Sequence, residues 1–383
     1  MSTSTTTTTS PHQPLTRIPP DILCARDYEA LAPRFLLPAH QAYIAGGSGF
    51  ETTLRANRAA FDAAQILPRL LRDVTAGHTR VSLLGQDLPH PILLAPLAFQ
   101  TLAHAGGELE TARAAEATDT CLVASTLSSH PLEDIAAASR SEKWFQLYFQ
   151  PLRESTLDLV RRAESAGYRT LVVTLDAAVQ SPSLRARRAG FAMPANVSPA
   201  NLAHHAQAPQ VAIERSQSLI LQGVMSEAPT WHDLEWLLQQ TRLPVIVKGV
   251  LRADDALALK QSGVAGVIVS NHGGRSLDGA PASLDMLAAV RRAVGEDYPV
   301  LLDSGVRAGS DIFKALAMGA DAVLIGRLQV FALAVAGALG VAHLLKLLRE
   351  ELELCMALAG CPTLADITAD CILQRNGLTH AHP

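Results

Sequence analysis

The sequence predicts an α/β fold, a (β/α)8 TIM barrel with an N-terminal helical segment and a long loop insertion after its fourth strand. Short apolar runs occur eight times, segments with a helical pattern separate them, and polar residues or glycines end the runs. Runs this rich in Val, Ile and Leu are typical of strands that are buried on both faces, as in a parallel sheet. Eight such strands alternating with helices indicate a closed barrel.

The predicted strands all follow Pro91. They cover residues 92–96, 121–125, 144–148, 170–176, 244–249, 266–272, 299–305 and 322–327. Helical patterns lie between them, for example at Ser155 to Tyr168, Thr230 to Thr241 and Asp311 to Ala320. A doubly wound open sheet is the competing arrangement. The count of eight strands and the lack of an early GxGxxG motif favour the barrel.

The barrel accounts for most of the chain, and we divide the rest by composition. Residues 1–20 are polar and low in complexity and are expected to form a disordered tail. Residues 21–90 should form a helical cap, with a small hairpin, over one end of the barrel. The barrel is expected at 91–370, interrupted by a lid-like insertion at 177–243, since one crossover needs far fewer residues. Residues 371–383 would be a C-terminal tail.

The composition is that of a globular protein with a small negative charge. Hydrophobic residues make up 48% of the 383 residues, charged residues 18%, and the net charge is -4. No basic excess points to nucleic acid or to an anionic membrane as a partner. The apolar stretch from Leu328 to Leu345 has the length of a membrane span. Its Gly and Ala content and Gln329 favour a buried helix instead.

The cysteines and the N-terminal residues bear on the cell compartment. The five cysteines are scattered without a CxxC pair, so they predict neither a disulfide framework nor a metal site. The first residues lack the basic and apolar regions of a signal peptide. We therefore expect a cytoplasmic protein with reduced thiols.

Polar side chains end seven of the eight predicted strands. In a barrel of this kind the carboxyl ends of the strands carry the chemistry, and polar groups would be costly there without a ligand. These residues are Ser125, Gln146, Tyr148, Thr174, Asp176, Lys248, Ser270, His272, Asp303 and Arg327.

Two of these strand ends also predict an anion site. Strand seven leads through a Gly-containing turn into a helix, with Arg307 in the turn, and strand eight ends at Arg327. Backbone N–H groups at a helix N-terminus and two guanidinium groups suit a phosphate, and barrels commonly hold one at this place.

The sixth strand leads into the segment SNHGGRSLDG, residues 270–279. His272 lies there on a Gly-flanked loop, three residues before Arg275. Because the ordinary pKa of His is near 6.5, modest tuning makes it a general base. Lys248 and Asp176 at neighbouring strand ends favour this functional interpretation over a structural one.

With these residues in view, the sequence resembles the FMN-dependent L-2-hydroxy acid oxidase and dehydrogenase family, which includes glycolate oxidase, lactate oxidase and mandelate dehydrogenase. The likeness extends over about residues 25–370. SNHGGRSLDG is its most specific motif. Further motifs agree with the family: YIAGGSG at 43–49, FQLY at 145–148, VKGV at 247–250 and LDSGVRAGSDIFKALAMGADAVLIGR at 302–327.

The resemblance implies roles for five catalytic and substrate-binding residues. His272 matches the base that takes the substrate proton, and Asp176 matches the carboxylate that orients its imidazole. Arg275 and Tyr43 match the groups that bind the substrate carboxylate. Tyr148 matches a tyrosine that forms a hydrogen bond near the reacting hydroxyl or carboxylate.

The resemblance also implies FMN as the cofactor. Lys248 matches a cation near the N1–C2=O edge of the flavin, where it stabilises the charge of the reduced ring. The remaining implied FMN contacts are Pro96, Leu97, Ala98, Ser125, Gln146, Thr174, Ser270, Asp303, Ser304, Gly305, Val306, Arg307, Gly326 and Arg327.

The implied reaction is the oxidation of an L-2-hydroxy acid to a 2-oxo acid, with O2 as the acceptor and H2O2 as the second product.

Two positions depart from the family. Ser183 occupies the place of a second substrate-binding arginine, for which Arg185 is a candidate substitute, and Leu127 replaces an aromatic residue. An FMN monooxygenase, or an oxidase of an aryl hydroxy acid, an amine or an amide, is therefore the alternative. A flavoprotein that binds FMN but does not turn over a substrate is the third hypothesis. The resemblance also implies a homotetramer or homo-octamer.

Overall fold

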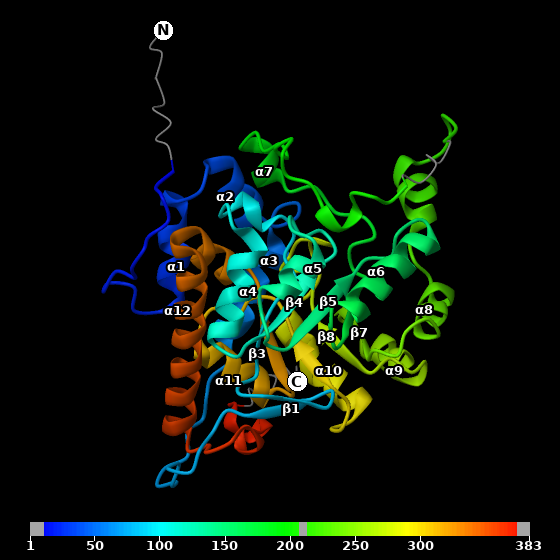
Figure 1. The fold of residues 1–383 in the computed structure, drawn as a ribbon. Helices are drawn as coiled ribbons and strands as arrows, with labels where there is room; N and C mark the ends of the chain where they lie inside the picture. The colour runs from blue at the N-terminus through cyan, green and yellow to red at the C-terminus, as the bar shows by residue number, and fades with distance from the viewer. Residues whose placement is uncertain (1–10, 207–212, 374–383) are drawn as a thin grey trace, which may run out of the picture.

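A closed barrel of eight parallel strands forms the centre of the computed structural model, which describes residues 11–206 and 213–373. The strands run around the barrel in the order β10-β3-β4-β5-β6-β7-β8-β9, with helices on the outside (Figure 1). Consecutive strands are neighbours, and the last pairs with the first, as in a (β/α)8 barrel. The predicted fold class is confirmed.

The strands are shorter than the apolar runs that predicted them. Their bounds are β3 (Ile92–Leu94), β4 (Cys121–Ser125), β5 (Lys143–Leu147), β6 (Leu171–Thr174), β7 (Val245–Val250), β8 (Gly266–Val269), β9 (Val300–Leu302) and β10 (Ala322–Ile325). Several predicted strand ends therefore lie on the loops after the strands. Asp176, His272 and Asp303 are examples, and the loops aim these side chains across the barrel mouth.

Helices cover the outside of the barrel between successive strands. They are α4 (Gly107–Ala117), α5 (Leu132–Ala137), α6 (Arg153–Ser165), α8 (Trp231–Leu238), α9 (Ala253–Gln261), α10 (Ser283–Val294), α11 (Gly309–Ala317) and α12 (Arg327–Ala359). The three helical patterns quoted from the sequence correspond to α6, α8 and α11, with ends that differ by a few residues.

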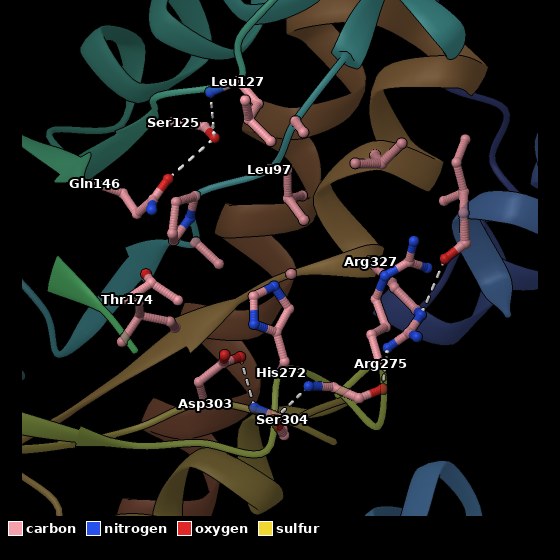
Figure 2. A pocket seen from close by; sticks show the side chains of 18 of the residues that line it. Leu97, Ser125, Leu127, Gln146, Thr174, His272, Arg275, Asp303, Ser304 and Arg327 are labelled. Atoms are coloured by element: carbon pink, nitrogen blue, oxygen red, sulfur yellow. Dashed lines mark hydrogen bonds between the residues drawn. The ribbon is translucent and has the colours of Figure 1, made fainter. Parts of the chain in front are cut away.

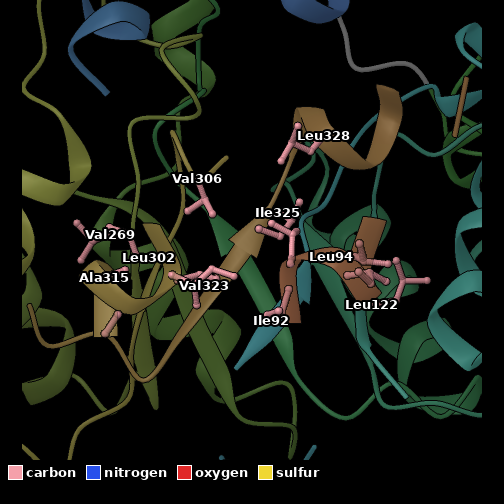
Figure 3. Close-up of a cluster of buried hydrophobic side chains, with 14 of the residues drawn as sticks. Ile92, Leu94, Leu122, Val269, Leu302, Val306, Ala315, Val323, Ile325 and Leu328 are labelled. Atoms are coloured by element: carbon pink, nitrogen blue, oxygen red, sulfur yellow. The ribbon is translucent and has the colours of Figure 1, made fainter. Parts of the chain in front are cut away.

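The strands bury both of their faces, because successive side chains point to opposite sides. Leu93 of β3 lies in the cluster inside the barrel, whereas Ile92 and Leu94 lie in the cluster between strands and helices. Figure 3 shows this outer cluster, in which Ile92 and Leu94 meet residues of the neighbouring strands. This explains why the strands appear in the sequence as continuous apolar runs.

A hairpin closes the N-terminal end of the barrel. It consists of β1 (Val81–Leu83) and β2 (Gln86–Leu88), whose leucines pack into the cluster inside the barrel. The Gln86 side chain accepts a hydrogen bond from Trp144 Nε1 at 2.9 Å and donates one to Thr170 Oγ1 at 3.2 Å. The hairpin expected in the N-terminal segment is thus present, and it leaves the opposite end open for a ligand.

The N-terminal segment is helical, as expected, and reaches further back than predicted. Its helices are α1 (Ala25–Leu31), η1 (Ala32–Arg34), α2 (Pro38–Ala45) and α3 (Thr52–Ala63). Before them, His12 N donates to Arg34 O at 2.9 Å and Leu15 N to Val335 O at 2.8 Å. The predicted tail at 1–20 was therefore wrong for residues 11–20, whereas residues 1–10 lie outside the described part of the chain.

The predicted C-terminal tail, 371–383, likewise begins inside the fold. Cys371 is 1% exposed, and Ile372 forms an antiparallel bridge with Ile66. Residues 374–383 lie outside the described part of the chain. The boundary was misplaced because one buried residue and one bridge leave no periodic pattern in the sequence.

Helix α12 contains the apolar stretch that the sequence singled out. Among the described residues it is the one helix long and apolar enough to cross a membrane, and 78% of its most apolar window is buried inside the fold. It is kinked at Ala336 and Gly337, whose φ angles are -151° and 55°. The helix packs against α1, α4 and α11. The expectation of a buried helix is confirmed.

The predicted insertion at 177–243 is only partly a loop. It holds α7 (Leu184–Arg188), the short turns η3 (Ala200–Leu202), η4 (Leu219–Gly223) and η5 (Val224–Glu227), and then α8. Because α8 covers the barrel between β6 and β7, it belongs to the barrel. Figure 1 shows the insertion extending over the upper rim in green. Residues 207–212 lie outside the described part of the chain.

Candidate active site

A pocket opens at the carboxyl ends of the barrel strands. Eighteen of the residues that the sequence singled out line it: Tyr43, Pro96, Leu97, Ala98, Ser125, Gln146, Tyr148, Thr174, Lys248, His272, Arg275, Asp303, Ser304, Gly305, Val306, Arg307, Gly326 and Arg327. The other two, Asp176 and Ser270, each form a hydrogen bond to a lining residue. The structure therefore brings all the candidate site residues together.

Further lining residues were not predicted. They are Ile44, Ala95, Phe99, Gln100, Leu102, Gln180, Gly273, Leu324 and Val330. Most are sequence neighbours of predicted residues, so adjacency alone could have suggested them. Gln180 is different because it comes from the insertion, where no periodic pattern marks the side chains that face the pocket.

His272 and Asp176 form a hydrogen-bonded pair. The imidazole Nδ1 lies 2.8 Å from Asp176 Oδ1, and His272 N donates to Ser270 Oγ at 3.0 Å. Burial acts to raise the pKa of Asp176, but the charges of Lys248 and His272 outweigh it and hold that pKa below its usual value. The carboxylate thus stays ionised. It holds the proton on Nδ1, which leaves Nε2 available to accept another.

Lys248 and Asp303 form a second buried ion pair at the pocket. Figure 2 shows Asp303 on the same side of the pocket as His272. Lys248 Nζ lies 2.9 Å from Asp303 Oδ2 and donates to Ser270 Oγ at 3.0 Å. Ser270 Oγ in turn donates to Asp303 at 2.8 Å. Burial acts to lower the pKa of Lys248, but Asp303 and Asp176 outweigh it and raise that pKa above its usual value. Lys248 therefore keeps its positive charge although the side chain is buried.

The phenol of Tyr148 is also kept in one protonation state. Its side chain lines the pocket, and burial raises the pKa of Tyr148 to about 12. At neutral pH the hydroxyl keeps its proton and remains a hydrogen-bond donor. It is therefore suited to donate to an oxygen of a bound ligand.

Two arginines join the barrel mouth to the N-terminal segment. Arg275 Nη1 donates to Tyr43 O at 2.7 Å and Gly46 O at 3.0 Å. Arg327 donates to the carbonyl oxygens of Ile44, Gly46 and Gly273. Burial, together with other guanidinium groups, lowers the pKa of Arg327 to about 9. Its positive charge is thus poorly compensated, which favours an anion nearby.

Arg307 lies on the same side of the pocket. Its guanidinium forms an ion pair with Glu29 of α1 at 2.8 Å, and its side chain lines the pocket. The predicted anion site therefore contains both of its arginines, although each is also engaged by protein groups.

Two positions, Ser183 and Leu127, depart from the family pattern, and of these only Leu127 lines the pocket. Ser183 caps α7, its Oγ accepting from Ala186 N at 3.3 Å. Arg185 does not take the place of the absent arginine, because it pairs with Glu51 and does not line the pocket. Leu127 does line the pocket, as the sequence indicated.

Several buried polar atoms around the pocket find no protein partner. Within the described residues, Gln146 Nε2, Thr174 Oγ1 and Asp176 Oδ2 make no hydrogen bond. The Gln146 amide is nevertheless oriented, because Ser125 Oγ donates to its Oε1 at 3.2 Å (Figure 2). Buried donors need acceptors. The unpartnered donors and the charged Lys248 fit the polar edge of the FMN ring. Arg307 and Arg327 fit its phosphate.

Glu108 connects two loops that line the pocket, and it gives a pH-dependent prediction. Its Oε1 accepts from Gln100 N at 3.0 Å and Ser129 N at 2.9 Å. Burial raises the pKa of Glu108, so the folded state binds its proton more tightly than the unfolded state does. Ionising this carboxyl then lowers stability as the pH rises above about 4.

A Glu108→Gln variant keeps an acceptor oxygen but cannot ionise. We expect its stability relative to the wild type to increase between pH 4 and pH 7, as measured by urea unfolding at both values. An exchange of the exposed Glu154 for Gln should show no such trend. A constant difference across this pH range would contradict the prediction.

Asn57 of α3 supports the loop that carries His272. Asn57 Nδ2 donates to Asn271 Oδ1 at 2.9 Å, and Asn271 Nδ2 donates to Asn57 Oδ1 at 2.7 Å. Asn57→Ala removes both of these buried hydrogen bonds, although Asn271 Oδ1 still accepts from Gly274 N and Asn271 Nδ2 still donates to Pro281 O. The loss of two hydrogen bonds costs about 1–3 kcal/mol. We expect a matching loss of unfolding free energy together with slower flavin reduction. The exposed Asn196 exchanged for Ala is the control, and equal behaviour of the two variants would contradict the prediction.

Comparisons with known proteins agree with this geometry. The family model described as FMN-dependent dehydrogenase matches residues 32–374. The chain is 63% identical to an L-lactate oxidase of Alicycliphilus denitrificans over 357 residues, which are 93% of this chain and 98% of that protein. It is 44% identical to a 4-hydroxymandelate oxidase of Amycolatopsis orientalis over 323 residues, 83% of this chain and 89% of that protein.

A solved structure shows the same similarity in three dimensions. The crystal structure of a mandelate oxidase with (S)-2-phenylpropionate superposes with a TM-score of 0.82 at 40% sequence identity. The superposition covers 90% of this chain and 96% of the other. Most of both chains therefore share one fold.

Proposed function

Because the chain belongs to the FMN-dependent dehydrogenase family, we propose that it is an oxidase that converts an L-2-hydroxy acid to the 2-oxo acid, with O2 as acceptor and H2O2 as product. L-Lactate is the substrate to test first, since a lactate oxidase shares 63% of the aligned residues. The observation that carries the proposal is the His272–Asp176 pair, 2.8 Å apart, beside Arg275 at the pocket.

The residues around the pocket supply what this oxidation needs. FMN, when bound, would supply the acceptor for the hydrogen that leaves the carbon bearing the hydroxyl group, together with its two electrons. His272 Nε2 takes the hydroxyl proton, and Asp176 stabilises the imidazolium that results. Arg275 and Tyr43 bind the substrate carboxylate at the pocket edge. Tyr148 donates a hydrogen bond to a substrate oxygen, which holds the carbon in place for reaction.

Other residues would hold the cofactor. Lys248 keeps its charge through Asp303 and so stabilises negative charge at the polar edge of the ring. Gln146 and Thr174 offer the unpartnered donors. The strand-one segment Pro96, Leu97 and Ala98 lines the pocket wall. Ser125 and Ser270 are proposed to contact the ring and the ribityl chain. The residues proposed for the ribityl and phosphate groups are Asp303, Ser304, Gly305, Val306, Arg307, Gly326 and Arg327.

Anaerobic bleaching of the flavin tests the proposal. The purified protein should be yellow and should lose its absorbance near 450 nm on mixing with L-lactate, but not with D-lactate. In air, peroxide release should equal oxygen uptake. Failure of a broad panel of L-2-hydroxy acids to bleach the flavin would refute the activity, and oxygen uptake without peroxide would indicate a monooxygenase.

An aryl 2-hydroxy acid is the second candidate substrate. Leu127 lines the pocket at a position where an aromatic side chain would fill more space, and mandelate and 4-hydroxymandelate oxidases are among the relatives. Comparison of kcat/KM for L-lactate and (S)-mandelate separates the two. A ratio above 10 in either direction identifies the preferred class, since tenfold is about 1.4 kcal/mol of transition-state binding.

Assembly and location are also part of the proposal. We propose a cytoplasmic homotetramer or homo-octamer, as the family resemblance suggested. Light scattering coupled to size-exclusion chromatography measures the mass, and a value near 40.7 kDa, the mass of one chain, would refute it. Fractionation of cells that express the protein tests its location.

A further inference from the structure

The insertion is attached to the N-terminal segment at the pocket edge. We call residues 182–191 the clasp. Gly49 N donates to Pro182 O at 3.2 Å, and Gly49 forms a parallel bridge with Ser183. Arg185 of the clasp forms an ion pair with Glu51. These contacts hold the clasp against residues that follow Tyr43 in the chain.

The clasp ends in an aromatic side chain that contacts Tyr43. Phe191 and Tyr43 are stacked, with ring centroids 4.2 Å apart and planes 10° from parallel. Backbone geometry aims Phe191 at this ring: Gly190 adopts a φ of 69°, and Phe191 N donates to Ala186 O at 3.0 Å. This is the ending typical of a helix with glycine beyond its C-terminus, so the position of the ring is built into α7.

Tyr43 is also in contact with Arg275. The guanidinium carbon lies 4.9 Å from the centroid of the Tyr43 ring, and Arg275 Nη1 donates to Tyr43 O at 2.7 Å. A parallel ring at 4.2 Å fills the face that it covers, so the guanidinium is left with the opposite face of Tyr43. The three side chains form a layered stack in the order Phe191, Tyr43, Arg275.

Phe191 does not touch the pocket itself. Tyr43 and Arg275 both line it, whereas Phe191 is not among the lining residues of the described chain. It is half-buried, and its second aromatic neighbour is His40, with ring centroids 6.0 Å apart. Tyr43 is therefore the pocket-lining side chain on which Phe191 packs directly, whereas His40 reaches the pocket only through its hydrogen bond to Leu102 O at 2.9 Å.

We propose that Phe191 is a positioning residue for the substrate carboxylate. By covering one face of Tyr43 it keeps the tyrosine ring against Arg275, so that the hydroxyl and the guanidinium present one preformed site for two carboxylate oxygens. Side chains ordered before binding lose less freedom when the substrate arrives, which favours affinity. The inference rests on the proposed function, because it assigns the carboxylate to Tyr43 and Arg275.

Three substitutions separate the role of the ring from that of its volume. Phe191→Leu keeps an apolar side chain but loses the flat face, Phe191→Tyr keeps the face, and Phe191→Ala removes both. Phe50→Ala is the matched control, since Phe50 is 77% exposed on the segment next to the clasp. All kinetic values are expressed per bound FMN, and the thermal midpoint Tm of each holoenzyme is measured.

We expect Phe191→Leu and Phe191→Ala to raise KM for L-lactate about 10-fold, the upper range for one aromatic pair, with kcat changed less than about threefold. Phe191→Tyr and Phe50→Ala should stay within about twofold of the wild type. Titration of the oxidised holoenzyme with pyruvate, followed by the flavin spectrum, should show the same order of binding constants.

Two results would overturn the inference. One is a wild-type KM and pyruvate affinity in Phe191→Leu. The other is a loss of FMN or Tm in both Phe191→Leu and Phe191→Tyr with unchanged KM, which would make Phe191 a structural residue only. If no L-2-hydroxy acid of the panel bleaches the wild type, the proposed function has failed, and the pyruvate titration still decides whether Phe191 governs binding of a 2-oxo acid.

Discussion

Exchange of His272 for Asn is expected to slow anaerobic reduction of the flavin by L-lactate about 10²- to 10⁴-fold, while FMN stays bound. A positioned general base typically contributes a factor of this size. Asn is preferred to Ala because His272 has a φ of 58°, a conformation that Asn tolerates well. Stopped-flow absorbance near 450 nm measures the reduction rate, and the ratio of absorbance at 450 nm to that at 280 nm measures bound FMN.

A surface histidine provides the control for this experiment. His204 is exposed in the insertion, and its exchange for Asn should leave the reduction rate unchanged. A His272→Asn enzyme that reduces its flavin within tenfold of the wild-type rate would rule out His272 as the base. A loss of bound FMN to the same degree as the loss of rate would point to a structural role.

Exchange of Lys248 for Met is expected to lower the free energy of unfolding by about 3–5 kcal/mol, because removal of one partner leaves a buried charge uncompensated. That charge is Asp303, which lies 2.9 Å from Lys248 Nζ and is 8% exposed. The same change removes the positive charge proposed for the edge of the flavin, so the remaining holoenzyme should reduce its flavin more slowly. Urea unfolding of FMN-free protein measures the stability.

A double variant separates these two effects. Lys248→Met together with Asp303→Asn removes both charges, so we expect part of the stability to return while the reduction rate stays low. Lys346→Met is the control, since Lys346 is exposed and its pairing with Glu350 should be worth less than about 1 kcal/mol. A stability loss equal to this control in the single variant would contradict the expected cost.

The correspondence between sequence and structure is closest along the barrel. Each strand is buried on both faces, so its local sequence is apolar wherever the rest of the chain lies. The polar residues that interrupt these runs mark the barrel mouth, and Ser125, Lys248 and His272 all line the pocket there. Strand ends were less well predicted. The predicted strands extended to Asp176 and His272, whereas β6 ends at Thr174 and β8 at Val269, so both residues belong to loops.

The sequence by itself thus determined the barrel, the end that carries the pocket, and the residue types gathered there, because periodicity and strand-end polarity are local properties. Only the tertiary structure decided which distant side chains meet. It paired Arg185 with Glu51 instead of turning it to the pocket, placed Gln180 there, and stacked Phe191 on Tyr43. These contacts join residues whose separation in sequence carries no periodic signal, so packing and charge in the folded chain select them.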